Sequence, residues 1–144
     1  MKKKKINSKT IFPLTKKIGK RDWGSEYLLA LIPKILSLKK LIIKKGKKGG
    51  LQYHRLKNEC GYLLKGKLLI RYVGKNKKLK KKILTKGSVF HFPPNFIHQE
   101  EALTDCEIIE ASSPHFNDRV RVDKYFGLKE QGLPTTKRKE VVFK

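Results

Sequence analysis

Short apolar runs separated by glycine- and lysine-rich breaks make up most of the chain. Runs of this kind, rich in β-branched and aromatic residues and bounded by turn signals, predict β-strands. Turns are expected around Gly46, Gly66 and Gly87, at 74–76 and at 93–95. The expected strands are 27–32, 38–43, 51–56, 60–64, 68–73, 80–84, 88–92, 97–102 and 107–111. Such closely spaced short strands, without a convincing amphipathic helix, predict an all-β antiparallel sandwich or barrel.

The 144 residues suit a single domain with one core, flanked by basic ends. Residues 1–20 are lysine-rich and hold few core candidates, so we expect a basic N-terminal arm. Residues 129–144 have a similar composition and are expected to form a basic C-terminal tail, in which 141–143 is a candidate edge strand. The folded domain is then expected to span residues 21–128.

The net charge of +24, from 36 lysine and arginine residues against 12 acidic ones, raises the question of an anionic partner. Nucleic acid, anionic lipid and phosphorylated ligands are the usual partners of such a chain. Only six of the 36 are arginine, which supplies most bidentate and stacking contacts to nucleic acid. The lysines are also scattered along the sequence. This favours a solvated lysine surface, although an anionic partner, including a phosphate at the lysine run 75–82, stays open.

Cysteine usage and the absence of targeting signals predict a soluble, cytoplasmic protein. Cys60 and Cys106 each lie in an apolar stretch, which predicts free, buried thiols rather than a disulfide. The basic N-terminus is not followed by the apolar segment of a secretory signal. The longest hydrophobic stretch, 27–33, is too short to span a bilayer.

Two histidines and a glutamate are placed where strands could bring them together. Gln52 and His54 alternate on one expected strand and therefore share one face. Glu59 begins the next strand, His98 follows the proline turn at 93–95, and His91 on the outgoing strand is a spare. A set of two imidazoles and a carboxylate suits Zn, Mn, Fe or Ni. The alternative, polar residues at the rim of a sheet, stays open on these residues alone.

These stretches resemble the two motifs of the cupin superfamily of jelly-roll barrels, G(x)5HxH(x)3-4E(x)6G and G(x)5PxG(x)2H(x)3N. In this chain we interpret the first as His54–x–Leu56–x2–Glu59–x6–Gly66 and the second as Gly87–x5–Pro93–x–Asn95–x2–His98. On this interpretation Leu56 stands at a usual histidine ligand position. Asn95 replaces the turn glycine, which is tolerable because Asn adopts left-handed conformations, and Ala102 replaces the final Asn.

Further similarity extends the resemblance over about residues 21–128. The stretch 21–29, with Trp23, is similar to the first strand of mannose-6-phosphate isomerase-like cupins, and Gln52–x–His54 resembles their Q-x-H ligand pair. The segment 108–127 is similar to the closing segment of small sugar-related cupins. Its matching positions are Glu110, Ser112, Pro114, Asp118, Asp123, Tyr125 and Gly127.

The resemblance implies a cupin-type double-stranded β-helix that binds a divalent metal and a sugar or sugar phosphate, with aldose–ketose isomerisation as the reaction. It implies a metal on His54, Glu59 and His98, with Gln52 as a fourth ligand. Glu110 and His91 are the candidate catalytic residues. Arg71 and Trp23 are the candidates for substrate binding. By analogy with cupins of this size, a homodimer is expected.

Other functions remain open at this point. A non-catalytic cupin that binds a sugar or another small anion is favoured by Leu56 at a ligand position. An Fe(II) oxygenase would use the same two histidines and carboxylate, and a lysine-mediated nucleic-acid binder would need none of them.

Overall fold

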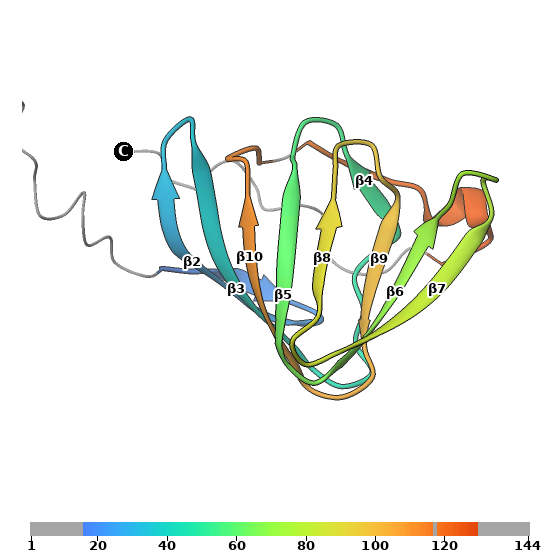
Figure 1. Cartoon of the computed structure of the whole chain (residues 1–144), viewed down its shortest axis with the longest axis horizontal. Helices are drawn as coiled ribbons and strands as arrows, with labels where there is room; N and C mark the ends of the chain where they lie inside the picture. The colour runs from blue at the N-terminus through green and yellow to red at the C-terminus, as the bar shows by residue number, and fades with distance from the viewer. Residues whose placement is uncertain (1–15, 117, 130–144) are drawn as a thin grey trace, which may run out of the picture.

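The structure, a computed structural model, describes residues 16–116 and 118–129 and contains two antiparallel sheets (Figure 1). The strands are β1 Lys16–Arg21, β2 Gly24–Ile32, β3 Leu36–Ile43, β4 Gln52–His54, β5 Glu59–Lys65, β6 Lys67–Val73, β7 Leu79–Thr85, β8 Val89–Phe92, β9 His98–Ala102, β10 Cys106–Ser112 and β11 Arg119–Arg121. One 3-10 turn, η1 Asp123–Phe126, follows the last strand. The six-stranded sheet has the order β1-β2-β3-β10-β5-β8 and the five-stranded sheet the order β11-β4-β9-β6-β7.

The inner faces of the two sheets pack on each other to form one core. Strict alternation along β3 and β10 places every second side chain inside, as the period of a strand requires. The buried apolar residues come from both sheets: Leu41, Ile43, Leu63, Leu68, Ile70, Phe90, Phe92, Ala102, Cys106 and Ile108. Two sheets joined in this way give the jelly-roll barrel that the sequence predicts.

The register between β3 and β10 divides the barrel interior into an apolar half and a polar half. At one end Ile43 pairs with Cys106 and Leu41 with Ile108. At the other end Lys39 pairs with Glu110, and beyond this pair the hydroxyl groups of Ser37 and Ser112 hydrogen-bond at 2.9 Å. Because these polar residues occupy inward positions, the sequence itself places charge inside one end of the barrel.

The all-β fold and each of the expected strands are confirmed. Three elements were not expected: β1, β11 and η1. Strand β11 has only three residues, two of them arginine. Strand β1 begins at Lys16, inside the range that the sequence assigned to the basic arm. The expected strand 51–56 ends at His54, because the backbone N–H groups of the next turn bond a side chain instead of a strand. The candidate edge strand 141–143 lies outside the described residues.

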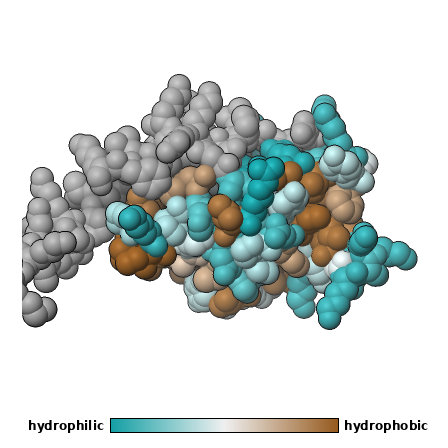
Figure 2. All heavy atoms as spheres, turned by 90° about the horizontal axis from the view of Figure 1, so that it is seen from above, coloured by the Kyte–Doolittle hydropathy of each residue, from teal (hydrophilic) through white to brown (hydrophobic). Residues whose placement is uncertain are grey.

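Both cysteines are free, as expected, but only Cys106 is buried. Cys60 is exposed because it alternates with the inward Glu59 and Gly61 along β5, which corrects the expectation of two buried thiols. On the outside, Lys80, Lys81 and Lys82 of β7 are exposed, and hydrophilic residues cover much of the face in Figure 2, between separate hydrophobic patches. No helix within residues 16–116 and 118–129 has the length and apolar character needed to cross a membrane.

Gly61 marks the closest packing between β5 and β8. An alanine methyl group there would stand 2.1 Å from Cζ of Phe90, its partner in the strand pairing. We expect Gly61→Ala to lower the free energy of unfolding by about 1–3 kcal/mol, measured by urea denaturation, because an overpacked core must shift. Gly49→Ala is the matched control, since no atom lies within 4 Å of its added methyl group. Equal losses in the two variants would contradict this account.

Candidate metal centre

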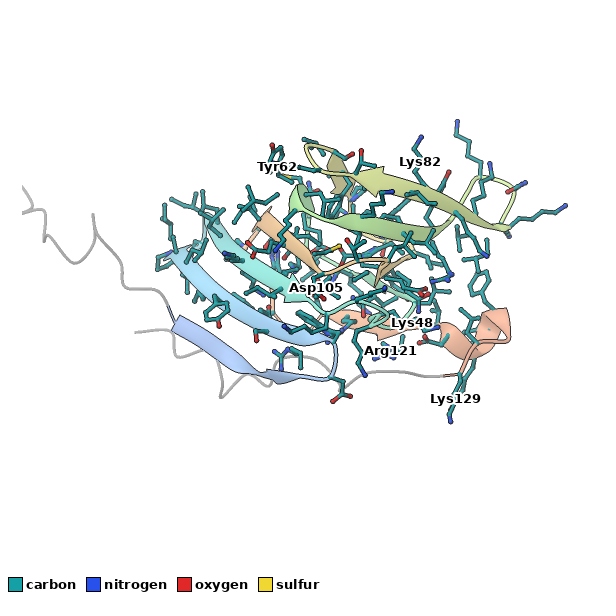
Figure 3. The ribbon with its side chains drawn as sticks, turned by 90° about the horizontal axis from the view of Figure 1, so that it is seen from below. Lys48, Tyr62, Lys82, Asp105, Arg121 and Lys129 are labelled. Atoms are coloured by element: carbon teal, nitrogen blue, oxygen red, sulfur yellow. The ribbon has the colours of Figure 1, made fainter. Side chains whose placement is uncertain are left out.

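The polar half of the barrel contains a cavity of about 110 Å³ that opens to solvent. Figure 3 shows side chains of both sheets crowding into the space between them, whereas Tyr62 and Lys82 lie at the outside. The polar residues that line the cavity are Arg21, Glu26, Lys39, Gln52, His54, Lys57, Glu59, His98, Glu100, Glu110, His115, Asp118 and Arg119. Trp23, Leu41, Ile43 and Phe116 supply most of the apolar wall.

His54, Glu59 and His98 converge inside this cavity, as the sequence predicts. Oε1 of Glu59 lies 3.2 Å from Nε2 of His98 and 3.6 Å from Nε2 of His54. One ligand atom from each residue can be chosen so that all three lie within 4.8 Å of one another. Their side chains are only 4–11% exposed. The residues come from β4, β5 and β9, so the two sheets share the site.

Hydrogen bonds on the far side of each imidazole decide which nitrogen faces the cavity. Nδ1 of His54 lies 3.0 Å from Oδ1 of Asp118, and Nδ1 of His98 lies 2.9 Å from the carbonyl oxygen of Phe96. A carboxylate and a carbonyl accept hydrogen bonds, so each Nδ1 carries the proton and donates it. The ring of Phe92 also stacks on His98, with centroids 3.9 Å apart. Both Nε2 lone pairs therefore point toward Glu59.

Burial and neighbouring charges set the ionisation of His54 and Glu59. Burial lowers the pKa of His54 to about 4, so its ring is neutral at neutral pH. Burial alone would raise the pKa of Glu59, but the adjacent Lys57 ammonium holds it well below its usual range. Two imidazoles whose Nε2 atoms face one carboxylate fit a divalent cation, and the outward hydrogen bonds are those of metal-bound histidines.

Asp118 fixes this part of the site from a position far along the chain. Its Oδ2 accepts hydrogen bonds from the backbone N–H groups of Leu56 and Lys57, at 2.9 and 2.7 Å, while Oδ1 accepts from His54. These bonds hold the pKa of Asp118 below its usual value against the opposing effect of burial. The turn after β4 and the orientation of His54 thus depend on one carboxylate.

The structure corrects the interpretation of the first motif. Leu56 is 61% exposed and does not line the cavity, whereas Gln52 and His54 alternate on β4 and both do. The motif therefore runs Gly46–x5–Gln52–x–His54–x4–Glu59–x6–Gly66, with every spacing satisfied. Gln52 replaces the first histidine, and His54 is the second. The apparent loss of a ligand at Leu56 arose from a shift of two residues, and it no longer favours a metal-free protein.

Lys57 is the main residue of the cavity that the sequence did not indicate. Its ammonium is buried and lies 2.6 Å from Oε2 of Glu59 and 3.1 Å from Oε1 of Glu110. Burial alone would lower the pKa of Lys57, but the two carboxylates raise it, so the side chain is charged. Burial raises the pKa of Glu110 despite the nearby ammonium. No sequence signal separates this lysine from the many exposed ones.

A second group of buried charges closes the cavity on the side of β2 and β3. Glu26 lies between Nε of Arg21, at 3.0 Å, and Nζ of Lys39, at 2.7 Å. Burial alone would raise the pKa of Glu26, but Lys39 and Arg21 hold it below its usual value. Lys39 also lies over the ring of Phe116, 5.1 Å from its centroid. These pairs are internal to the wall of the cavity.

The remaining candidates divide into residues that reach the cavity and residues that do not. Glu110 and Trp23 line it, and Trp23 also packs against the core. His91 is exposed on β8, where its Nε2 lies 2.7 Å from Oδ1 of Asn58. Arg71 of β6 pairs with Glu101 and donates to Gln99 at 3.2 Å. Both partners lie on the face of β9 opposite to that of His98. The structure therefore does not bring His91 or Arg71 to the site.

Glu100 and Arg119 are further cavity residues that sequence reasoning missed. Glu100 shares the inward face of β9 with His98, and burial raises its pKa to about 8. Its Oε1 is buried and has no hydrogen-bond partner among the described residues. Arg119 donates from Nη1 to Oε1 of Gln52 at 2.8 Å. The alternation around His98 could have pointed to Glu100, but nothing in the sequence predicted that β11 would pair with β4.

Comparisons with known proteins agree with this geometry. The model of the Cupin family matches residues 36–135, which is more than half of the chain. The chain therefore belongs to the cupin family. No curated protein matches the chain. The chain therefore has a cupin barrel with a candidate metal site. The family alone does not define the activity, because cupin folds support many different activities.

Solved structures share the fold at low sequence identity. The capsular polysaccharide assembling protein CapF from Staphylococcus aureus is 23% identical with a TM-score of 0.65, covering 76% of this chain and 34% of CapF. KdgF from Halomonas sp. is 24% identical with a TM-score of 0.57, covering 65% of this chain and 81% of KdgF. An oxalate oxidase in complex with the substrate analogue glycolate is 20% identical with a TM-score of 0.54, covering 61% and 46%. This chain thus spans about a third of the length of CapF.

The Lys57 ion pairs can be tested by removing the charge and keeping the bulk of the side chain. We expect Lys57→Met to lower the free energy of unfolding by about 3–5 kcal/mol at pH 7, because it leaves buried carboxylates without a counter-ion. The measurement is urea denaturation of chelator-treated protein. Lys82→Met, on the exposed face of β7, is the matched control and should change stability little. A similar small change in both variants would count against the buried ion pairs.

Proposed function

We propose that the protein is a metal-dependent cupin that acts on a sugar or sugar phosphate, and that the reaction is an aldose–ketose isomerisation. One observation carries the proposal. The Nε2 atoms of His54 and His98 face the carboxylate of Glu59 inside a cavity that a second carboxyl group, Glu110, also lines. Metal donors beside a separate proton-transferring group are what this chemistry requires.

The metal would be held by His54, Glu59 and His98, with Gln52 as the fourth ligand. When bound, a Zn, Mn, Fe or Ni ion would act as a Lewis acid that polarises the carbonyl and hydroxyl oxygens of the sugar. The amide oxygen of Gln52 is a harder donor than the imidazole it replaces, which favours Zn or Mn.

Glu110 is the proposed base that moves a proton between adjacent carbons of the sugar. It lines the cavity, and Lys57 fixes its carboxyl group by holding Oε1 at 3.1 Å. Trp23 supplies an apolar wall on which the face of a sugar ring can pack. A carbohydrate ligand is also in keeping with the polysaccharide-assembling role named for CapF, whose cupin fold this chain shares.

A second candidate function is a cupin that binds a sugar without converting it. The observation in its favour is that Lys57 ties Glu110 and Glu59 into one ion-pair network. Lys57 donates a hydrogen bond to Oε1 of Glu110, and this bond opposes the transfer of a substrate proton to that oxygen.

Metal content tests the site directly. We expect the purified full-length protein to carry close to one divalent ion per chain, measured by mass spectrometry of metals, and His98→Ala to lose it. His91→Ala is the matched control and should keep the ion, because His91 lies outside the cavity. Circular dichroism checks that both variants stay folded. A metal-free wild type, or equal metal content in the two variants, would contradict the site.

Exchange of substrate protons with solvent tests the reaction. We expect metal-loaded protein to convert mannose 6-phosphate or glucose 6-phosphate to the ketose in D2O, with deuterium entering the carbon next to the carbonyl, followed by NMR. Glu110→Gln should abolish the deuterium incorporation while retaining the metal, because the amide cannot accept the proton. Binding of either sugar without any exchange in the wild type would favour the non-catalytic function. Iron as the bound metal, with oxygen uptake, would favour an oxygenase.

A further inference from the structure

Four lysine and arginine side chains of the described residues line the cavity, and three of them have carboxylate partners. Arg21 and Lys39 share Glu26, at 3.0 and 2.7 Å. Lys57 lies between Glu59 and Glu110. These three cations therefore belong to the internal charge balance of the barrel, since buried charges are stable only when they are paired.

Arg119 is the exception. Within the described part of the chain its guanidinium makes one hydrogen bond, from Nη1 to the neutral amide oxygen of Gln52 at 2.8 Å. Among residues 16–116 and 118–129, no carboxylate oxygen lies within 4.0 Å of its guanidinium nitrogens. A guanidinium has five N–H donors in a planar fork, so most of its donor capacity is left over.

The guanidinium of Arg119 stays protonated in this environment. Burial, and then the like charge of Arg121, lower its pKa to about 10, which leaves the guanidinium protonated at neutral pH. The carboxylates of Glu26 and Glu59 favour the charged form, but no carboxylate of the described residues pairs with the guanidinium, so its burial costs free energy. An anion supplied from outside would remove that cost.

The strand pairing places Arg119 beside the metal donors. Arg119 is the direct partner of His54 in the pairing of β11 with β4, and Arg121 is the partner of Gln52. The preceding residue, Asp118, orients His54, and Arg119 itself bonds Gln52. A molecule in the cavity that reaches the donors therefore also reaches the guanidinium.

We propose that Arg119 receives an anionic oxygen group of the ligand, a carboxylate or a phosphate, so that the site takes acidic sugar derivatives and rejects neutral sugars. Both groups match the two parallel N–H bonds of a guanidinium fork. The inference rests on the proposed function and narrows its substrate class. It assigns to Arg119 the role that the sequence had suggested for Arg71, which lies on the other face of β9.

NMR titration of the full-length ¹⁵N-labelled protein, metal-free and zinc-loaded, tests the assignment. Acetate and inorganic phosphate at constant ionic strength are the sugar-free probes, followed by D-glucuronate, D-glucose 6-phosphate and D-glucose. The backbone amide signals of β4 and β11 report binding in every variant. Arg119→Gln removes the charge, Arg119→Lys keeps the charge without the fork, and Arg71→Gln is the control with the same change of charge outside the cavity.

We expect saturable shifts with at least one of the two small anions and at least tenfold weaker binding in Arg119→Gln. Arg119→Lys should be intermediate and serves if the Gln variant does not fold, whereas Arg71→Gln should match the wild type. Tighter binding of acetate identifies a carboxylate ligand, and tighter binding of phosphate a sugar phosphate. D-glucose should not bind comparably.

Three results would overturn the inference: no saturable response to either small anion, unchanged affinity in both Arg119 variants, or binding of D-glucose as tight as that of its acidic derivatives. Failure of the proposed function gives a different pattern. A wild type that takes up no metal while the anions still act through Arg119 would reject the metal-dependent function and leave the anion site standing.

Discussion

Lys57 places its ammonium between Glu59 and Glu110 inside the barrel, at 2.6 and 3.1 Å. Without this charge, two inward carboxyl groups would face each other in a space with little water, and one of them would take up a proton. The ammonium keeps Glu59 ionised. An ionised Glu59 beside His54 and His98 completes a candidate set of metal donors. The ionisation of the cavity's carboxyl groups therefore depends on one buried lysine.

The fold tolerates such a dense group of charges because the register of the sheets keeps them at one end. Along β3 and β10 the inward positions change from apolar to polar within one pair of residues, from Leu41 opposite Ile108 to Lys39 opposite Glu110. The apolar half supplies the burial that stabilises the barrel. The polar half makes a small contribution, since buried ion pairs roughly offset the cost of their own desolvation. Stability and chemistry thus occupy different ends of the same strands.

The sequence predicted the parts of this arrangement that depend on local pattern. Strand positions follow from apolar runs and turn residues, and His54, Glu59 and His98 follow from alternation together with the motif spacings. Lys57 and Arg119 were missed because their roles arise from partners 53 and 67 residues away, Glu110 and Gln52. The motif register was a different case: Gln52 was already a candidate ligand from the sequence, but Leu56 was assigned to a histidine position until the structure showed it exposed.

The glutamine at position 52, where the cupin motif has a histidine, links the candidate metal site to the charge of Arg119. An imidazole at this position would have one lone pair for a metal and an N–H on its other nitrogen. That N–H would then compete with the donors of Arg119 for the same space. The amide oxygen of Gln52 has two lone pairs, so it can accept the bond from Arg119 and still offer a second pair to the cavity. A glutamine at the first motif position is therefore compatible both with a candidate metal site and with the guanidinium of Arg119, which pairs with no carboxylate of the described residues.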